Sequence, residues 1–246
     1  MKMNNAVVLV TGANRGLGRA LVQVILEAGA RRVYAGARDP KQLEAIVGAA
    51  PDRIVPLAID ITDARSLEAA AARAADITVL VNNAGVLSSH NVLTSSTEQI
   101  ALDFTTNVFG MLAATKAFLP ALERSGAAGE AALVNVLSIV SLASMPLLGG
   151  YASAKAAAFS ITQALRSELA KKQIRVHAAL PGTIDTDMVR GFDTPKTSPE
   201  VVAKSIIEGV EQGLEEILPD PMSRDLHAVW KRDPKALEQM FASMTG

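Results

Sequence analysis

Tyr151 and Lys155 have the residue types and the spacing of a proton-transfer pair. They are four positions apart, so both side chains would lie on the same face of an α-helix. An ammonium group beside a phenol stabilises the phenolate and lowers a tyrosine pKa that is about 10 when unperturbed. Such a pair could exchange a proton with a carbonyl or alcohol oxygen near neutral pH, although Tyr-Lys pairs also arise on helices by chance.

A glycine-rich turn near the amino terminus has the pattern of a dinucleotide-binding site. Residues 11–18 read Thr-Gly-Ala-Asn-Arg-Gly-Leu-Gly, after an apolar run at 6–10 and before a segment of helical composition. Glycines let backbone N–H groups approach a pyrophosphate, and a helix amino terminus favours negative charge. The alternative is that these glycines serve only a tight turn and close helix–strand packing. The predicted cofactor contacts here are Gly12, Asn14, Arg15, Gly16, Leu17 and Gly18.

Short β-branched runs alternate with longer alanine-rich segments along the chain. This alternation predicts an α/β fold with a doubly wound parallel sheet of about seven strands and helices on both faces. The expected strands are 6–10, 32–37, 53–59, 78–82, 131–137, 174–180 and 216–218. The expected helices include 16–28, 66–74, 103–122 and 152–171.

Composition excludes several classes of protein. With 246 residues we expect one domain, 1–246, and 49% hydrophobic with 20% charged residues is a globular balance. The net charge of -1 gives no reason to expect nucleic acid or a membrane as partner.

The absence of cysteine excludes disulfides and zinc–thiolate sites and fits a cytoplasmic protein. Three scattered histidines give no metal-ligand spacing, so we expect no metal. The run at 6–10 is too short for a membrane span and has no signal-peptide cleavage pattern.

From about Val7 to Thr186 the chain resembles the short-chain dehydrogenase/reductase family. The resemblance is carried by motifs in the family's order: the glycine turn, Asp60, Asn82-Asn83-Ala84-Gly85, Asn107, Ser138, Tyr151 to Lys155, and Pro181-Gly182. It implies a single-domain Rossmann fold and an oxidoreductase that uses a nicotinamide cofactor.

The resemblance also implies a catalytic tetrad. Tyr151 would be the general acid in reduction, and Ser138 would hydrogen-bond the same substrate oxygen. Lys155 would contact the nicotinamide ribose and depress the tyrosine pKa. Asn107 would hold a water that links the lysine to solvent.

Alternatives remain for single residues. Ser141 and Ser144 are nearby competitors for the role of Ser138. Asp60, which the family places beside the adenine ring, could merely cap the next segment. The motif at 82–85 could serve cofactor contact or plain turn chemistry.

The resemblance implies cofactor contacts beyond the glycine turn. Ile184 would contact the nicotinamide carboxamide through its backbone, and Thr186 through its hydroxyl group. The remaining contacts are expected at Asp60, Ile61, Asn83, Ala84, Gly85, Tyr151, Lys155, Pro181 and Gly182.

The residues after the second strand favour NADP(H) over NAD(H). Ala37 occupies the position where an NAD enzyme typically has an acidic residue for the ribose 2′-hydroxyl. Arg38 and Arg15 could clamp a 2′-phosphate by charge-assisted hydrogen bonds. Asp39 argues the other way, since a small register error would bring it to the ribose, and a solvated turn before Pro40 is a further alternative.

Apolar side chains around the tyrosine predict a substrate pocket, although core packing explains some of them equally well. They are Val140, Met145, Leu148, Met188 and Phe192, together with the polar Ser138 and Tyr151. Because no Lys or Arg cluster flanks them, we expect a small, neutral, apolar ketone, aldehyde or secondary alcohol. The connection 182–199 is either a substrate lid or a simple surface excursion.

The carboxyl-terminal part departs from the family's pattern. Many tetrameric members end in a glycine-rich segment, whereas this chain has an extension at 222–244, where we expect a helix over 223–244 carrying Trp230. We therefore expect a homodimer through segments 103–122 and 152–171, with a tetramer still open.

Three functions fit the sequence: an NADPH-dependent carbonyl reductase that also works in reverse, a catalytically idle cofactor sensor, and a scaffold protein. The intact tetrad favours the enzyme.

Overall fold

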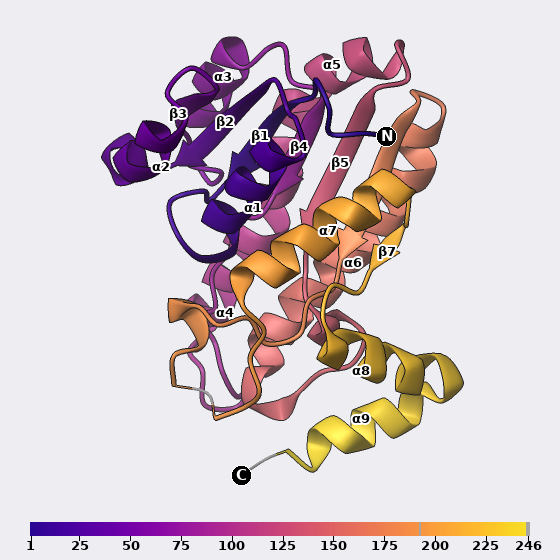
Figure 1. Ribbon diagram of the computed structural model, residues 1–246. Helices are drawn as coiled ribbons and strands as arrows, with labels where there is room; N and C mark the ends of the chain where they lie inside the picture. The colour runs from indigo at the N-terminus through magenta and orange to yellow at the C-terminus, as the bar shows by residue number, and fades with distance from the viewer. Residues whose placement is uncertain (192, 245–246) are drawn as a thin grey trace.

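The protein folds around one parallel β-sheet. The computed structural model describes residues 1–191 and 193–244. Within that part the sheet has seven strands in the order β3-β2-β1-β4-β5-β6-β7 (Figure 1). The strands are β1 Val7–Thr11, β2 Arg32–Ala37, β3 Ile54–Ala58, β4 Val79–Asn82, β5 Ala131–Val136, β6 Ile174–Ala179 and β7 Glu216–Ile217. The order reverses between β1 and β4, so the predicted doubly wound α/β sheet is confirmed, with each strand within one or two residues of its expected bounds.

Helices cover both faces of the sheet. They are α1 Gly16–Glu27, α2 Glu44–Ala49, α3 Ala64–Arg73, α4 Thr97–Phe104, α5 Met111–Gly126, α6 Gly149–Ala170, α7 Pro199–Gln212, α8 Pro221–Arg232 and α9 Pro234–Ala242. Strand residues alternate between two cores, as the period of two in a strand requires. Val8 and Val10 of β1 pack with α1 and α7, whereas Val7 and Leu9 pack with α3 and α5. The three layers hold the strand ends rigidly, and the site is built on these ends.

The segment 103–122 is helical, as expected, but its helical stretch starts earlier and contains a π-helical turn. A capping box between Ser96 and Gln99 starts α4 at Thr97, earlier than expected. Residues Thr105–Gly110 then form a π-helical turn before α5 begins. A π-turn inserts one extra residue in the helix and changes which side chains face inward. Asn107 lies in this turn and is only 2% exposed.

The expected single helix over 223–244 is wrong, because the extension forms two helices. Pro234 lacks a backbone N–H and disfavours helical geometry in the residue before it. Asp233 accordingly has extended backbone angles and caps α9 by accepting a hydrogen bond from Lys235 N at 2.9 Å. In Figure 1 the helices α8 and α9 extend beyond the lower end of the sheet.

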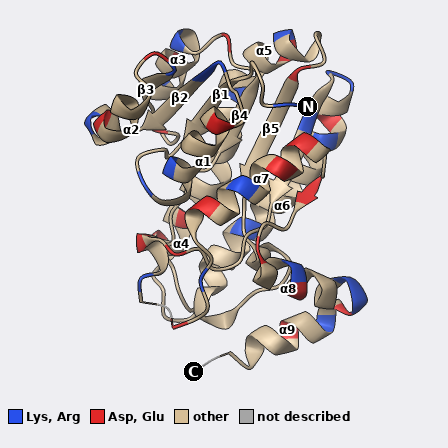
Figure 2. Ribbon diagram, viewed as in Figure 1, with Lys and Arg blue, Asp and Glu red and all other residues tan. Residues whose placement is uncertain are grey.

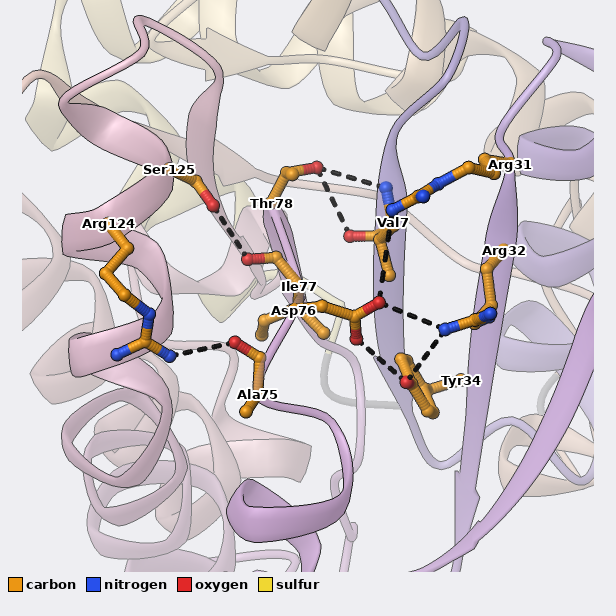
Figure 3. Close-up of polar contacts among 10 residues, drawn as sticks. All are labelled: Val7, Arg31, Arg32, Tyr34, Ala75, Asp76, Ile77, Thr78, Arg124 and Ser125. Atoms are coloured by element: carbon orange, nitrogen blue, oxygen red, sulfur yellow. Dashed lines mark hydrogen bonds and ion pairs between the residues drawn. The ribbon is translucent and has the colours of Figure 1, made fainter.

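A polar cluster ties the strands together at their amino ends, opposite the candidate site (Figure 3). Asp76 accepts hydrogen bonds from Tyr34 Oη at 2.8 Å and from Arg32 Nη1 at 3.0 Å. Thr78 Oγ1 accepts from Val7 N at 3.1 Å. Burial and the hydrogen bond to Asp76 raise the pKa of Tyr34. The cluster fixes β1, β2 and β4, whose other ends carry the glycine turn and Arg38.

Charged side chains of both signs are spread over the visible helices in Figure 2, in keeping with the net charge of -1. Across residues 1–191 and 193–244, every helix is too short or too polar to cross a membrane.

Candidate active site

The carboxyl ends of the strands open into one cleft with a volume of about 770 Å³. Every residue that the sequence predicts for the site lines this cleft, with the exception of Phe192, which lies outside the described residues. The chain thus brings the predicted cofactor, catalytic and substrate residues together in a single place.

The glycine turn at the amino-terminal side of the cleft has room for backbone atoms only. Gly12 has a φ of +67°, and a Cβ there would lie 2.9 Å from Ala84 Cα. At Gly18 a Cβ would lie 2.0 Å from the Gly12 carbonyl oxygen. Helix α1 starts at Gly16, and no side chain caps its free N–H groups. A helix start of this kind fits a phosphate group.

The Asn83 side chain hydrogen-bonds to the backbone of this turn. Its Nδ2 donates to Thr11 O at 2.9 Å and to Gly12 O at 3.2 Å. Thr11 Oγ1 in turn accepts from Asn83 N and Ala84 N, both at 3.0 Å. Both alternatives for the motif at 82–85 therefore have a structural basis: the Asn83 side chain holds the turn, while Gly85 and its neighbours line the cleft.

The residues after β2 bring one cationic and one anionic side chain, Arg38 and Asp39, to the cleft. Ala37 is the last residue of the strand, and Arg38 beside it is exposed. The Asp39 carboxylate accepts from Lys41 N at 3.0 Å and so caps the short turn Pro40–Leu43. Asp60 accepts from Thr62 Oγ1 at 2.7 Å and from Thr62 N at 2.9 Å. These hydrogen bonds, with a smaller contribution from Arg38, lower the pKa of Asp60.

Tyr151 and Lys155 lie on one face of α6, as their spacing predicts. The Lys155 Nζ atom is 5.6 Å from the centroid of the Tyr151 ring and donates to Val136 O at 3.2 Å. The two residues are 9% and 6% exposed. Ser138 follows β5 and lines the cleft, whereas Ser141 does not line it and is buried. Of the three candidate serines, Ser138, Ser141 and Ser144, only Ser138 lines the cleft.

The expected lowering of the Tyr151 pKa is not found. Burial raises the pKa of Tyr151, and the negative charge of Asp103 raises it further. Burial also lowers the pKa of Lys155 to about 8, against an opposing effect of Asp103. The sequence shows that a tyrosine and a lysine are neighbours, but it does not show that both side chains are buried. Burial has the largest effect on the pKa of each. Near pH 7 Tyr151 is a neutral phenol with a proton to give, and Lys155 is mainly an ammonium ion.

Asn107 is held by the backbone that borders the cleft. Its Nδ2 donates to Val86 O at 2.9 Å, and its Oδ1 accepts from Val86 N at 3.1 Å. The amide side chain therefore fixes the strand-end segment after Gly85. Asn107 also lines the cleft close to the other members of the predicted tetrad.

Comparison with known proteins identifies the family. The profile described as short chain dehydrogenase matches residues 6–196. The chain belongs to the short chain dehydrogenase family. It is therefore an oxidoreductase of a family that acts on CH–OH and C=O groups.

Solved structures show the same fold over the whole chain. A short chain dehydrogenase from Burkholderia cenocepacia J2315, in complex with NADP, is 37% identical with a TM-score of 0.92, and the match covers 100% of both chains. A 3-ketoacyl-(acyl-carrier-protein) reductase from Brucella melitensis, complexed with NADH, is 26% identical with a TM-score of 0.79, covering 90% of this chain and 93% of that one. The short chain dehydrogenase pigC of Monascus ruber is 33% identical over 204 residues, which is 78% of this chain and 66% of that protein.

In this dehydrogenase the carboxyl-terminal helices supply a wall of the cleft that the sequence analysis missed. Met222 and Leu226 of α8 and Phe241 of α9 line the cleft. Leu226 and Phe241 pack in one apolar cluster with Tyr151 and Leu148. The only sequence signal was the pairing of apolar residues at i and i+4, 222 with 226 and 237 with 241, which marks an inward helix face but not what it faces.

The predicted pocket residues lie at different depths. Val140 and Leu148 are 6% and 8% exposed, so they serve both the core and the cleft wall. Met145 lies in the same apolar cluster. Met188 is 46% exposed, at the rim.

A buried carboxylate joins this wall to the loop after β6. Asp220 Oδ2 accepts from Gly182 N at 2.8 Å, and its Oδ1 accepts from Ser223 N at 2.8 Å at the start of α8. Asp220 is 1% exposed. It thereby fixes the substrate side of the dehydrogenase relative to Pro181 and Gly182, which line the predicted nicotinamide end.

A β-bridge joins the two ends of the connection 182–199. Ile184 and Thr197 form a parallel bridge, with Asp185 N donating to Thr197 O at 2.9 Å. Thr186 and Ile184, the predicted nicotinamide contacts, lie at one of these ends and line the cleft. Further along, Arg15 Nη1 approaches Asp187 Oδ2 at 3.4 Å.

Proposed function

We propose that this dehydrogenase is an NADPH-dependent carbonyl reductase that reduces an apolar ketone or aldehyde to the alcohol and also works in reverse. One observation carries the proposal: the buried Tyr151 lies beside Lys155 in a cleft that is lined by the glycine turn and by apolar side chains.

The residues of the glycine turn fit a dinucleotide, because Gly12 and Gly18 leave no room for a Cβ and α1 begins there without a side-chain cap. Gly12, Asn14, Arg15, Gly16, Leu17 and Gly18 would hold the pyrophosphate side, and Ile184 and Thr186 the nicotinamide side. Once bound, the cofactor supplies hydride.

The protein's own contribution is proton transfer and positioning. Tyr151 gives its phenolic proton to the substrate oxygen as that oxygen gains negative charge. Ser138 donates a hydrogen bond to the same oxygen. The Lys155 ammonium stabilises the phenolate that remains, so its positive charge matters most after the proton has left. Burial of the tyrosine and lysine excludes water, which strengthens this interaction.

NADP(H) is the proposed cofactor. Supporting this, Arg38 and Arg15 both line the cleft, and the Asp39 carboxylate, which lines it too, accepts a hydrogen bond from Lys41 N in its own turn. The Burkholderia relative binds NADP. The Brucella relative was solved with NADH, so the fold accepts either cofactor and the choice rests on these side chains.

The proposed substrate is small, neutral and apolar. Support comes from the wall formed by Val140, Leu148, Leu226 and Phe241, none of which carries a charge or a hydrogen-bonding group. A homodimer through segments 103–122 and 152–171 is also proposed, because Phe109 in the first of them is 61% exposed. A cytoplasmic location is proposed from the cysteine-free sequence.

The experiment is to follow oxidation of NADPH, and separately of NADH, by the purified protein with a panel of apolar ketones and aldehydes. The proposal expects turnover with NADPH and much slower turnover with NADH. NADPH binding without turnover of any carbonyl in the panel would instead support a cofactor sensor.

A further inference from the structure

Asp103 is a fully buried carboxylate that the proposed chemistry does not use. It lies in α4 with 0% of its surface exposed. Its Oδ1 accepts from Ser88 N at 2.8 Å, and its Oδ2 accepts from Ser89 N at 2.9 Å and from the Ser89 hydroxyl group. Within the described part of the chain, no cation forms an ion pair with it. Burying a charge is costly, so an unpaired buried carboxylate needs either hydrogen bonds or a more distant opposite charge.

The hydrogen bonds of Asp103 connect α4 to the start of α6 through residues 86–90. Asn107, one turn further along the same helical stretch, holds Val86. Ser89 packs so tightly against Gly150 that a Cβ there would lie 2.2 Å from Ser89 Oγ. Gly150 N also donates to His90 O at 3.3 Å. Segment 86–90 is thus clamped between Asp103 and the residue that precedes Tyr151.

The charges around Tyr151 and Lys155 are few. Helix α6 packs against α4, β6 and the turns Thr105–Gly110, Ile139–Ser141 and Pro146–Leu148, and these turns contain no ionisable side chain. Strand β6 carries Arg175, which is exposed, and His177, which contacts the Leu214 carbonyl oxygen. Helix α4 carries the exposed Glu98 and the buried Asp103.

We propose that Asp103 is a positioning residue of the active site: its buried carboxylate clamps segment 86–90 against the start of α6, the helix that carries Tyr151 and Lys155, and brings a negative charge to that part of the site. The proposal rests on the proposed function for its consequence in catalysis. The direction of the electrostatic effects agrees with it, because Asp103 raises the pKa of Lys155 against the effect of burial and also raises the pKa of Tyr151. Without this charge, Tyr151 and Lys155 would both lose their protons at lower pH.

Two variants separate charge from shape. Asp103→Asn removes the charge at nearly the same size, whereas Ser89→Ala removes one hydrogen bond to the carboxylate and leaves the charge. The first measurement needs neither substrate nor cofactor: the pH titration of the Lys155 side-chain signal by ¹³C NMR in lysine-labelled protein, assigned by its loss in Lys155→Met.

We expect the midpoint of the Lys155 titration to be lower in Asp103→Asn than in the unmodified protein by roughly half a pH unit or more. In Ser89→Ala it should stay in place. Equal titrations in the two variants would overturn the proposal. If Asp103→Asn does not fold, Asp103→Glu keeps a carboxylate at this position, and a Lys155 midpoint that falls there by roughly half a pH unit or more would equally overturn the proposal.

The pH dependence of kcat/KM for carbonyl reduction is the second readout. We expect the profile of Asp103→Asn to shift to lower pH, and that of Ser89→Ala to fall in height without shifting. A fall in height without a shift in both variants would show a purely structural role. Failure of the proposed function would remove this profile but leave the NMR titration intact, so the two outcomes are distinguishable.

Discussion

Arg15 Nη1 lies 3.4 Å from Asp187 Oδ2, and this contact joins the glycine turn to the connection 182–199 across the cleft. The two side chains are 72% and 49% exposed, so the contact is screened by solvent and adds little to stability. Arg15 can therefore exchange Asp187 for another anion at small cost. A ribose phosphate would be such an anion.

Removing a cationic side chain at this end of the cleft should change cofactor preference. We expect Arg38→Ala to weaken NADPH binding roughly tenfold or more and to change NADH binding by less than about threefold, because only NADPH has the 2′-phosphate. Arg15→Ala should act in the same direction. Titration calorimetry with both cofactors measures this.

Arg19→Ala is the matched control, since Arg19 is exposed on α1 one turn after Arg15 and does not line the cleft. An unchanged ratio of NADPH to NADH affinity in Arg38→Ala would refute the clamp.

Phe241 should control which substrates fit. It is fully buried in α9 and lines the cleft, so Phe241→Ala opens space in the apolar wall. We expect a loss of about 3–5 kcal/mol in unfolding free energy and a relative gain in kcat/KM for bulkier apolar ketones. Denaturant unfolding and assays with ketones of graded size measure the two effects.

Leu237→Ala provides the comparison, because Leu237 is equally buried one turn earlier in α9 but does not line the cleft. It should destabilise the protein without changing the preference among ketones. The same change in preference in both variants would mean that packing, and not the wall, sets specificity.

The parts of the site that depend on local sequence could be predicted, whereas the parts that depend on how a helix packs against the rest of the fold could not. The strands were predictable because buried parallel strands are continuous β-branched runs. The glycine turn was predictable because no residue with a Cβ fits at positions 12 and 18. The wall of Leu226 and Phe241 was not, because an amphipathic helix does not reveal what it packs against.

Two local features escaped prediction for physical reasons. The segment around Asn107 is helical, as expected, but composition does not distinguish an α-turn from the π-turn at Thr105–Gly110. The Tyr151 pKa was expected to fall, but burial and the negative charge of Asp103 raise it, and both are properties of the tertiary structure.

Lys155 should make the stability of the protein depend on pH. Its pKa is lowered to about 8 in the folded state from an ordinary value of 10.5, so the unfolded chain binds the proton more tightly. The free energy of unfolding should therefore rise from pH 8 upward, until the raised pKa of Tyr151 opposes it above pH 10. Below pH 8 the cost of the buried charge is fully present.

Lys155→Met removes this buried charge. We expect it to raise the free energy of unfolding at pH 7 by roughly 1–3 kcal/mol and to abolish the rise between pH 8 and pH 10. Denaturant unfolding at several pH values measures both. Lys116→Met, at an exposed position of α5, should leave the pH dependence as it is; a flat profile in the unmodified protein would contradict the prediction.

Asp220 should matter for the geometry between the two halves of the cleft. Asp220→Ala removes the acceptor for Gly182 N and Ser223 N, and we expect a loss of about 1–3 kcal/mol in stability. The KM for the carbonyl substrate should rise more than kcat falls, because α8 carries the substrate wall and no proton-transfer residue.

Asp225→Ala, at an exposed position of the same helix, should be neutral by comparison. An unaltered KM in a folded Asp220→Ala protein would show that the wall stays in position without this carboxylate.

The central claim is that Tyr151 gives the proton in an NADPH-dependent reduction, and the chain offers a sharp control because it has only two tyrosines. The measurement is NADPH oxidation with the best apolar carbonyl of the panel, compared among the unmodified protein, Tyr151→Phe and Tyr34→Phe. The account predicts that Tyr151→Phe loses roughly a hundredfold or more in kcat while still binding NADPH, and that Tyr34→Phe stays active. Comparable turnover in Tyr151→Phe and the unmodified protein would contradict it.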